Sequence, residues 1–544
     1  MISRMRLLVL VLAMLIFTLA ATCSKTAERP PFLPPPEPVP PPAARWDVRT
    51  DYSALTPYVP PNNMYSRLRP GPLPELLPSN DYGMLLPYSG AVVMDNGNLR
   101  EVRSGFVTID GVIVTDLVYD RIERAAYYLP LDIMERPAYR LVVNTMSPES
   151  SMYFHQSKAA ACALDGSWIT EFDYVEVIFT DTVIFLIRDH GSYDIDVYDY
   201  SGRKLYNTLE LEWINDIHPN QWPGSLAYDV SEGYGFVKMQ DGTVAAYEAL
   251  TGNIRNTEYA GAWAFCEGFA TVTKNSIDSG DYPELWGYIN SDFELVIPPA
   301  YTQVRSFQHG WAVVETGDGS QQIINTRGET LFSIPYNYQI ELNFDGTGFI
   351  VIRFENWQPE AIYTKDLVKI DIPERMQWDT PNVYIRYIGD GFYSVGLEDG
   401  LLLFTQDTEH FFPGFSESYY MNNEYFVFYV YDDSVAYAGV MSIEGREIIP
   451  RKKDVSITPA VYNDVTIAFI ENSNSVWYYS EWAFQPSAYR LIGMDGQVLA
   501  AGPGVLSFDQ NVGLYSVLGA DFFTWLDRDA NVIISIPLMS YTLD

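Results

Sequence analysis

Carboxylates are the most abundant side chains in this sequence that could do chemistry, and they point first to cation binding. The chain of 544 residues holds 70 Asp and Glu residues. Their densest run comprises Asp189, Asp194, Asp196 and Asp199. Calcium prefers oxygen ligands of this kind, but the run lacks the spacing of a calcium-binding loop. Acidic and apolar residues alternate over 194–197, which predicts a strand with one wet face. Calcium stays open as the alternative.

Histidine gives no local metal-site pattern. The five histidines are His155, His190, His218, His309 and His410. No two lie two to five residues apart, the spacing that would place both on one metal ion. The motifs G-x-S-x-G, H-E-x-x-H, G-x-x-x-x-G-K-[ST] and C-x-x-C are all absent. We therefore predict no resident metal or cofactor and no catalytic residue, and we read His309 as a turn residue.

Two cysteines lie in the body of the chain, Cys162 and Cys266. In an oxidising compartment they could form one disulfide. Free cysteine also behaves as a small buried hydrophobe, and nothing in this spacing implies pairing. The sequence favours two unpaired core residues.

A carbohydrate-active hydrolase is one enzymatic alternative. Glycosidases need two carboxyl groups about 5–10 Å apart, and β-propellers can carry such a pair in a central pocket. With 70 carboxylates in the chain this requirement does not discriminate. The aspartate-box repeat Ser-x-Asp-x-Gly-x-Thr-Trp does not occur. We expect the protein not to be an enzyme, with the hydrolase as the alternative.

Composition excludes two broad classes. There are 34 basic residues against 70 acidic ones, for a net charge of -36, whereas a nucleic-acid-binding surface needs a basic face. Hydrophobic residues make up 47% of the chain, enough to bury large cores and too many for wholesale disorder. We expect a folded, acidic protein with no nucleic-acid partner.

The first 22 residues have the layout of an export signal. Arg4 and Arg6 precede an apolar run over 7–17, and small residues follow up to Cys23. The end of this segment resembles the lipobox of bacterial lipoproteins, which implies lipid attachment at Cys23 and an extracytoplasmic protein anchored to the membrane. Cleavage after a nearby alanine, giving a secreted protein, and an uncleaved anchor are the alternatives.

Residues 23–80 read as a proline-rich stalk. Nine of the thirteen residues over 30–42 are proline. Proline lacks the backbone donor that helices and sheets need and favours extended polyproline II, a semi-rigid spacer. A stalk that lifts a folded domain off the membrane fits an exported protein. A ligand for a proline-recognition module is the alternative.

From residue 81 onward, short strands alternate with turns. Segments rich in Val, Ile, Tyr and Phe are separated by Gly, Asp and Asn, which is typical of all-β proteins. Turn signals recur at residues 166, 202, 242, 292, 328, 366, 407 and 445, which are 36 to 50 residues apart. Repeats of about forty residues are the length of one propeller blade or one solenoid unit. Only the segments 156–164 and 481–489 suggest short helices.

One repeat is preserved well enough to compare with a known family. It contains Trp286, Gly287, Tyr288, Pro298, Pro299, Tyr301, Phe307 and Gly310. In the unit before it, Phe265 and Gly268 stand 42 residues ahead of Phe307 and Gly310. This pattern resembles the bacterial WG (Trp-Gly) repeat family. The Trp would pack on the next unit, the adjacent Gly would permit close backbone approach, and the two prolines would end a ladder.

The expected fold is all-β, built from tandem WG-type repeats of about forty residues packed like a propeller, because closure removes exposed sheet edges. An open β-solenoid-like array is the alternative. We place a first repeat region over 81–335 and a degenerate second one over 336–544, with one continuous array as the alternative. The expected function is a non-enzymatic binding or scaffold surface for a protein or glycan, with a purely structural envelope protein as a further alternative.

Overall fold

The structure is a computed structural model. It describes residues 83–537, apart from the segments 94–99, 125–137, 145–156, 275–283, 374–384 and 474–487 and short gaps of one to three residues. The predicted signal, lipid attachment at Cys23 and proline-rich stalk lie outside the described residues.

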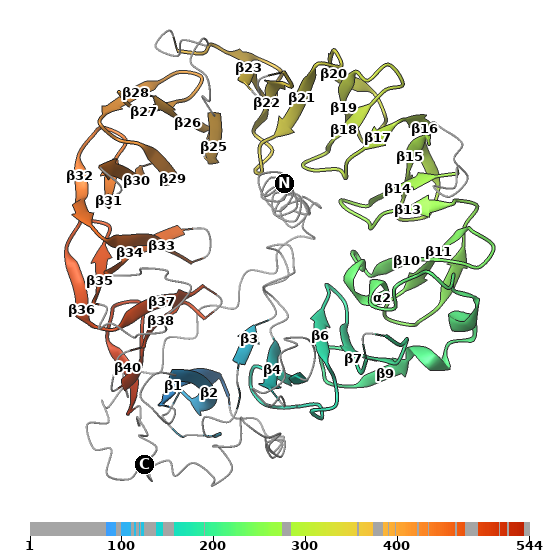
Figure 1. Ribbon diagram of the computed structural model, residues 1–544, viewed down its shortest axis with the longest axis horizontal. Coiled ribbons are helices and arrows are strands. Elements are labelled where there is room, and N and C mark those ends of the chain that lie inside the picture. The colour runs from blue at the N-terminus through green and yellow to red at the C-terminus, as the bar shows by residue number, and fades with distance from the viewer. Residues whose placement is uncertain are drawn as a thin grey trace, which may run out of the picture.

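Antiparallel sheets follow one another around a ring (Figure 1). Within the described residues, eight of them have four strands and two have three, so the fold is a ten-bladed β-propeller. A further two-stranded sheet lies between the last blade and the first. Its strands are β1 (Leu85–Val93) and β2 (Arg100–Thr108). Each blade uses strands that are consecutive in the sequence, paired in sequence order.

The first three blades contain β3 (Arg121–Arg124), β4 (Ala138–Asn144) and β5 (Ser157–Ala163); β6 (Glu176–Phe179), β7 (Ile184–Ile187), β8 (Ile195–Tyr198) and β9 (Lys204–Asn207); and β10 (Tyr234–Lys238), β11 (Val244–Glu248) and β12 (Ile254–Asn256). The short helices η5 (Thr208–Glu210), η6 (Glu212–Asp216) and α2 (Ser225–Tyr228) lie between β9 and β10.

The next four blades contain β13 (Gly261–Ala262), β14 (Phe269–Thr273), β15 (Trp286–Asn290) and β16 (Leu295–Tyr301); β17 (Gln303–Val304), β18 (Trp311–Glu315), β19 (Gln321–Asn325) and β20 (Thr330–Ile334); β21 (Tyr338–Leu342), β22 (Gly348–Arg353), β23 (Gln358–Thr364) and β24 (Lys369–Ile370); and β25 (Ile385–Gly389), β26 (Phe392–Leu397), β27 (Gly400–Phe404) and β28 (Glu409–Pro413).

The last three blades contain β29 (Glu417–Met421), β30 (Tyr425–Asp432), β31 (Val435–Ser442) and β32 (Glu447–Lys453); β33 (Val455–Tyr462), β34 (Val465–Ser473), β35 (Ala488–Gly493) and β36 (Val498–Pro503); and β37 (Val505–Asp509), β38 (Leu514–Leu518), β39 (Phe522–Leu526) and β40 (Val532–Pro537). In the three blades from β25 to β36, the first strand lies toward the centre of the ring and the last strand on its outside (Figure 1).

The β1–β2 sheet closes the ring. On one side Val107 packs with Phe523 and Trp525 of the last blade, and the Trp525 indole N–H donates to the Pro87 carbonyl at 3.1 Å. On the other side Phe106 packs with Tyr139 of the first blade, with ring centroids 5.0 Å apart. The predicted propeller-like packing is therefore confirmed, and the open array is excluded.

Hydrophobic clusters form between neighbouring blades. Trp311 and Ile323 of one blade share a cluster with Phe349 of the next, and this cluster spans the chain segment around residue 336. The largest fully buried side chains among the described residues are all Tyr or Phe. The aromatic excess of the sequence therefore fills the space between blades, where one buried aromatic contributes about 2–3 kcal/mol of transfer free energy.

One of the two expected helices is wrong. Residues 157–163 form β5, which pairs with β4 along its whole length. Alanine favours helix intrinsically, but here Ala159, Ala160 and Ala161 are fully buried between neighbouring sheets. Small side chains in a tightly packed strand override that propensity. Residues 481–487 lie outside the described residues, and β35 begins at Ala488.

Candidate binding surface at the inner edge of the ring

The Trp-Gly pair of the predicted repeat starts β15, the third strand of its blade. Trp286 is 9% exposed, and its ring centroid lies 6.4 Å from that of Trp263. A Cβ on Gly287 would lie 2.3 Å from the Ile297 carbonyl oxygen, so the neighbouring backbone leaves no room for a side chain. The expected close approach at this glycine is therefore present.

Pro298 and Pro299 sit on the outer strand β16, which continues through them to Tyr301. The β15–β16 register pairs Tyr288 with Ile297 and Trp286 with Tyr301, so the prolines form a bulge opposite Gly287. The expectation that they would end the ladder is wrong, because an outer edge strand tolerates residues that cannot donate.

The remaining repeat residues connect one blade to the next. The Tyr288 side chain is fully buried, and its hydroxyl donates to the Arg305 carbonyl of the following blade at 2.8 Å. Phe307 is also fully buried and contacts the Tyr288 ring at 4.9 Å between centroids. Phe265 holds the corresponding place in the preceding unit and is 1% exposed. These residues are structural.

The glycines at 268 and 310 lie in two-residue hairpin turns between the first and second strands of their blades. Glu267 and Gly268 have φ of 53° and 79°, and His309 and Gly310 have 51° and 80°. Such turns need positive φ at both positions, which explains the glycines. His309 is thus a turn residue, and its ring Nε2 lies 3.0 Å from the Phe344 carbonyl oxygen.

Carboxylates in these turns bind the turn of the following blade. Glu267 accepts hydrogen bonds from the backbone N–H groups of His309 at 2.5 Å and Gly310 at 2.8 Å. Glu232, in the equivalent turn one blade earlier, accepts from Gly268 at 3.0 and 3.2 Å. These two carboxylates therefore link the hairpin turns of three successive blades and hold those blades in place relative to one another. Sequence reasoning missed it, although the spacing of these Glu residues from their glycines was visible.

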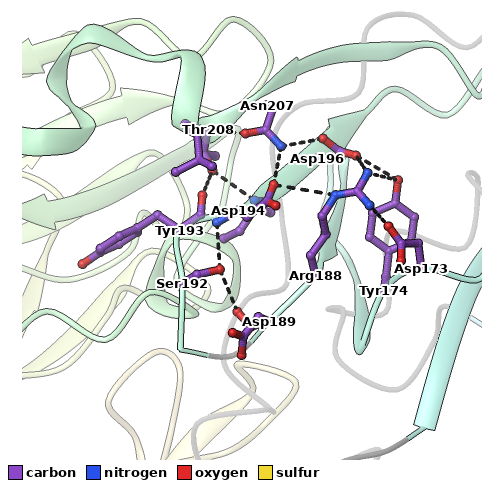
Figure 2. Close-up of polar contacts among 12 residues, drawn as sticks. Asp173, Tyr174, Arg188, Asp189, Ser192, Tyr193, Asp194, Asp196, Asn207 and Thr208 are labelled. Carbon is purple, nitrogen blue, oxygen red and sulfur yellow. Dashed lines mark hydrogen bonds and ion pairs between the residues drawn. The ribbon is translucent and has the colours of Figure 1, made fainter. Parts of the chain in front are cut away.

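The four aspartates considered as calcium ligands perform separate tasks, and Figure 2 shows three of them, Asp189, Asp194 and Asp196. Asp196 lies on β8 and is fully buried. Arg188 donates to its Oδ2 at 2.7 Å, and Lys204 and Asn207 donate to its Oδ1 at 2.6 and 2.7 Å. Asp194 accepts from the same Asn207 amide at 2.7 Å. The strand prediction is confirmed, but the wet face is wrong at Asp196, because these donors replace water.

The other two aspartates of the run cap turns. Asp189 accepts from the Gly191 N–H at 3.0 Å, and Asp199 accepts from the Ser201 and Arg203 N–H groups at 3.0 and 3.1 Å. Among the described residues, no group of three or more His, Cys, Asp or Glu side chains is placed to hold a metal ion. The run is thus built for turns and an internal ion network.

Two opposing effects act on the pKa of Asp196. Burial disfavours the carboxylate and raises the pKa, but hydrogen bonds from Lys204, Asn207, Tyr174 and Arg188 outweigh burial and leave the pKa below its ordinary value. Glu471 on β34 is also 1% exposed, with a lowered pKa, and binds Lys452 and Arg490. Carboxylates held ionised in this way support structure and are poor proton donors at neutral pH.

The cysteines and the remaining histidines that the structure describes form no common metal site. Cys162 and Cys266 are buried in different blades and form no disulfide, and their thiols lie 3.2 Å from the Ala163 and Phe307 carbonyl oxygens. His218 lies before α2 and His410 on β28. His155 and His190 lie outside the described residues.

A row of exposed side chains crosses four successive blades at one register position. Each member lies opposite the third residue of the second strand, on or directly after the first strand. The pairs are Trp263 with Thr271, Arg305 with Val313, Glu341 with Ile350, and Arg386 with Ser394. Trp263 is 59% exposed, and the three charged residues are also exposed. We call these four residues the inner row.

Charge alternates along the inner row. Partial enclosure lowers the pKa of Arg305, and nearby Glu341 opposes this shift. The same enclosure raises the pKa of Glu341, with Arg305 acting in the opposite direction. Both groups are exposed to solvent, yet both lose solvation, which fits side chains on the inside wall of a ring.

The blade before Trp263 differs from the others. Its first strand is reduced to a single bridge between Ile217 and Met239, and α2 follows at the inner end of that blade (Figure 1). Trp222 and Tyr228, 50% and 39% exposed, stack there with ring centroids 5.2 Å apart. Sequence reasoning missed this pair and the inner row, because the members share a register position and no residue type.

Comparison with known proteins supports the repeat and adds little on function. The model of a family described as WG containing repeat matches residues 286–319, so the chain carries a WG repeat in this segment. The match begins on β15, the third strand of one blade, and ends just after β18, the second strand of the next. This repeat therefore joins two blades. No curated protein matches the sequence.

The structure of this chain is only weakly similar to two solved structures. One is titled "Crystal structure of the eukaryotic initiation factor", with 12% identity over 46% of this chain and 82% of that chain and a TM-score of 0.26. The other is titled "The crystal structure of BamB from Moraxella catarrhalis", with 9% identity, 67% and 96% coverage and a TM-score of 0.21. Similarity this low carries no functional argument.

Within the described part of the chain, no helix is long and apolar enough to cross a membrane.

Proposed function

We propose that this protein is exported, is anchored to the membrane through lipid on Cys23, and presents its propeller as a non-enzymatic binding surface for a protein or glycan. The export layout and Cys23 support the location, and residues 23–80 would serve as the stalk. The inner row supports the binding role and is the observation that carries it.

The inner row suits recognition because it is exposed while its scaffold is fixed. Trp263 exposes more than half of its surface, whereas Trp286 beside it is buried. Hydrogen bonds such as Tyr288 to the Arg305 carbonyl hold the backbone under the row. Side chains presented on rigid strands bind with a smaller loss of conformational entropy.

Two experiments test this proposal. The first is metabolic labelling of the full chain with a lipid precursor in wild type and Cys23→Ala; label that persists in the variant rejects the anchor. The second incubates the full chain with candidate glycans and measures both retention and newly released reducing ends. Retention without release is expected. Release that continues over many turnovers would support the hydrolase instead.

A further inference from the structure

We infer that the inner edge of the ring from α2 to β25 binds a linear, uncharged glycan lying across the blades. The inference rests on the proposed binding function and names its ligand class. The surface comprises Trp222, Tyr228 and the inner row, Trp263, Arg305, Glu341 and Arg386.

The aromatic end of this surface offers preformed flat platforms. The benzene ring of Trp222 lies over Gly224, where a Cβ would come within 2.3 Å of it. Tyr228 stacks on the same indole with an interplanar angle of 24°. Gly224 and Tyr228 therefore restrict the indole before any ligand binds. Exposed, restrained aromatic rings match the apolar C–H faces of sugar rings and lose little entropy on binding.

The charged end supplies hydrogen bonds suited to hydroxyl groups. Each guanidinium carries five N–H donors, and the Glu341 carboxylate between Arg305 and Arg386 only accepts. A sugar hydroxyl both donates and accepts, so alternating donors and acceptors along the row match neighbouring hydroxyls. A chain with net charge -36 repels acidic polymers, which favours an uncharged glycan over an acidic one.

The direction of the surface argues against an extended peptide. A peptide that added to an inner strand would run along that strand and stay on one blade. The inner row instead runs from blade to blade, across the strands, at one register position. A ligand that contacts Trp263, Arg305 and Glu341 together cannot pair with them as a strand. A linear polymer with repeated rings and hydroxyls meets this geometry.

Isothermal titration of the full chain with chitohexaose and cellohexaose tests the inference, with hexagalacturonate as the acidic counterpart. We expect saturable binding of at least one uncharged hexasaccharide and weaker binding of the acidic one. Trp263→Ala and Arg305→Ala should each weaken binding about tenfold, as for central contacts in other interfaces. Tyr336→Ala is the matched control, because Tyr336 is 71% exposed but lies outside the surface.

The outcomes separate this inference from the proposed function. Binding of the acidic oligomer alone, or binding that both row variants leave unchanged while circular dichroism shows them folded, overturns the glycan assignment. Absence of oligosaccharide binding together with capture of an envelope protein that Trp263→Ala abolishes also overturns it, while the proposed binding function stands. A Trp263→Phe variant that restores most of the affinity supports ring stacking.

Discussion

Removal of the Glu267 side chain should loosen the turn of the neighbouring blade. Its two carboxylate oxygens accept hydrogen bonds from the His309 and Gly310 N–H groups, and no other residue of the turn replaces them. In Glu267→Ala both donors lose their partner. The change leaves the hydrophobic clusters between these blades intact, so its effect should be local.

The expected magnitude follows from the two bonds. A hydrogen bond to a charged group contributes about 1.5–3 kcal/mol, and water that reaches this half-buried turn replaces part of that contribution. We therefore expect a loss of about 2–3 kcal/mol in the free energy of local opening, which is about 30- to 150-fold faster amide exchange at the turn.

Hydrogen exchange measured by mass spectrometry on peptides covering 307–313 tests this directly. Peptides from distant blades should exchange as in wild type. Glu329→Ala is the control, because Glu329 pairs only with its own turn, through Asn325 and Arg327, and is exposed. Unchanged exchange at 307–313 in a folded Glu267→Ala protein would refute the idea that these carboxylates couple the blades.

Three further predictions concern stability. Gly287→Ala should destabilise the fold by about 1–3 kcal/mol or more, because the new Cβ meets the Ile297 carbonyl; a thermal midpoint within a degree of wild type would contradict this. Because the pKa of Asp196 is lowered on folding, its stabilisation is complete above the ordinary carboxylate range, about pH 4, and is lost as pH falls below it. Asp196→Asn should therefore unfold with a flatter acid dependence in fluorescence titrations, and an unchanged slope would count against the network. Trp286→Ala should cost about 3–5 kcal/mol and Trp263→Ala about 0.5 kcal/mol or less in urea unfolding, and equal losses would reject the assignment of one to the core and one to the surface.

The repeat pattern of the sequence predicted the fold well, for a physical reason. Turns with positive φ require glycine, so Gly268 and Gly310 mark equivalent hairpins regardless of how the strands diverge. Trp286 with Gly287 marks a place where bulk and close approach are needed side by side. Strand positions between blades accept many apolar residues, and so the degenerate repeats hid the number of blades.

The candidate surface was beyond sequence reasoning because its members are related only by register. Trp263, Arg305 and Glu341 differ in size, polarity and charge, and they align only once strand pairing is known. At Asp196 the sequence pattern gave a wrong prediction of solvent exposure. Alternation along β8 indicated a solvated carboxylate, whereas basic side chains from the same blade enclose it.

In-cell photocrosslinking is the most direct test of the claim that the inner edge of the ring is the binding surface. A photoreactive benzophenone amino acid would replace Gln303, which is exposed on β17 two residues before Arg305, in one strain and Arg327, at an exposed outer turn, in another. The full chain would then be irradiated in the cells that produce it. We predict ligand-bearing adducts at position 303 that greatly exceed those at position 327. Adducts confined to position 327, with none at 303, would contradict the account.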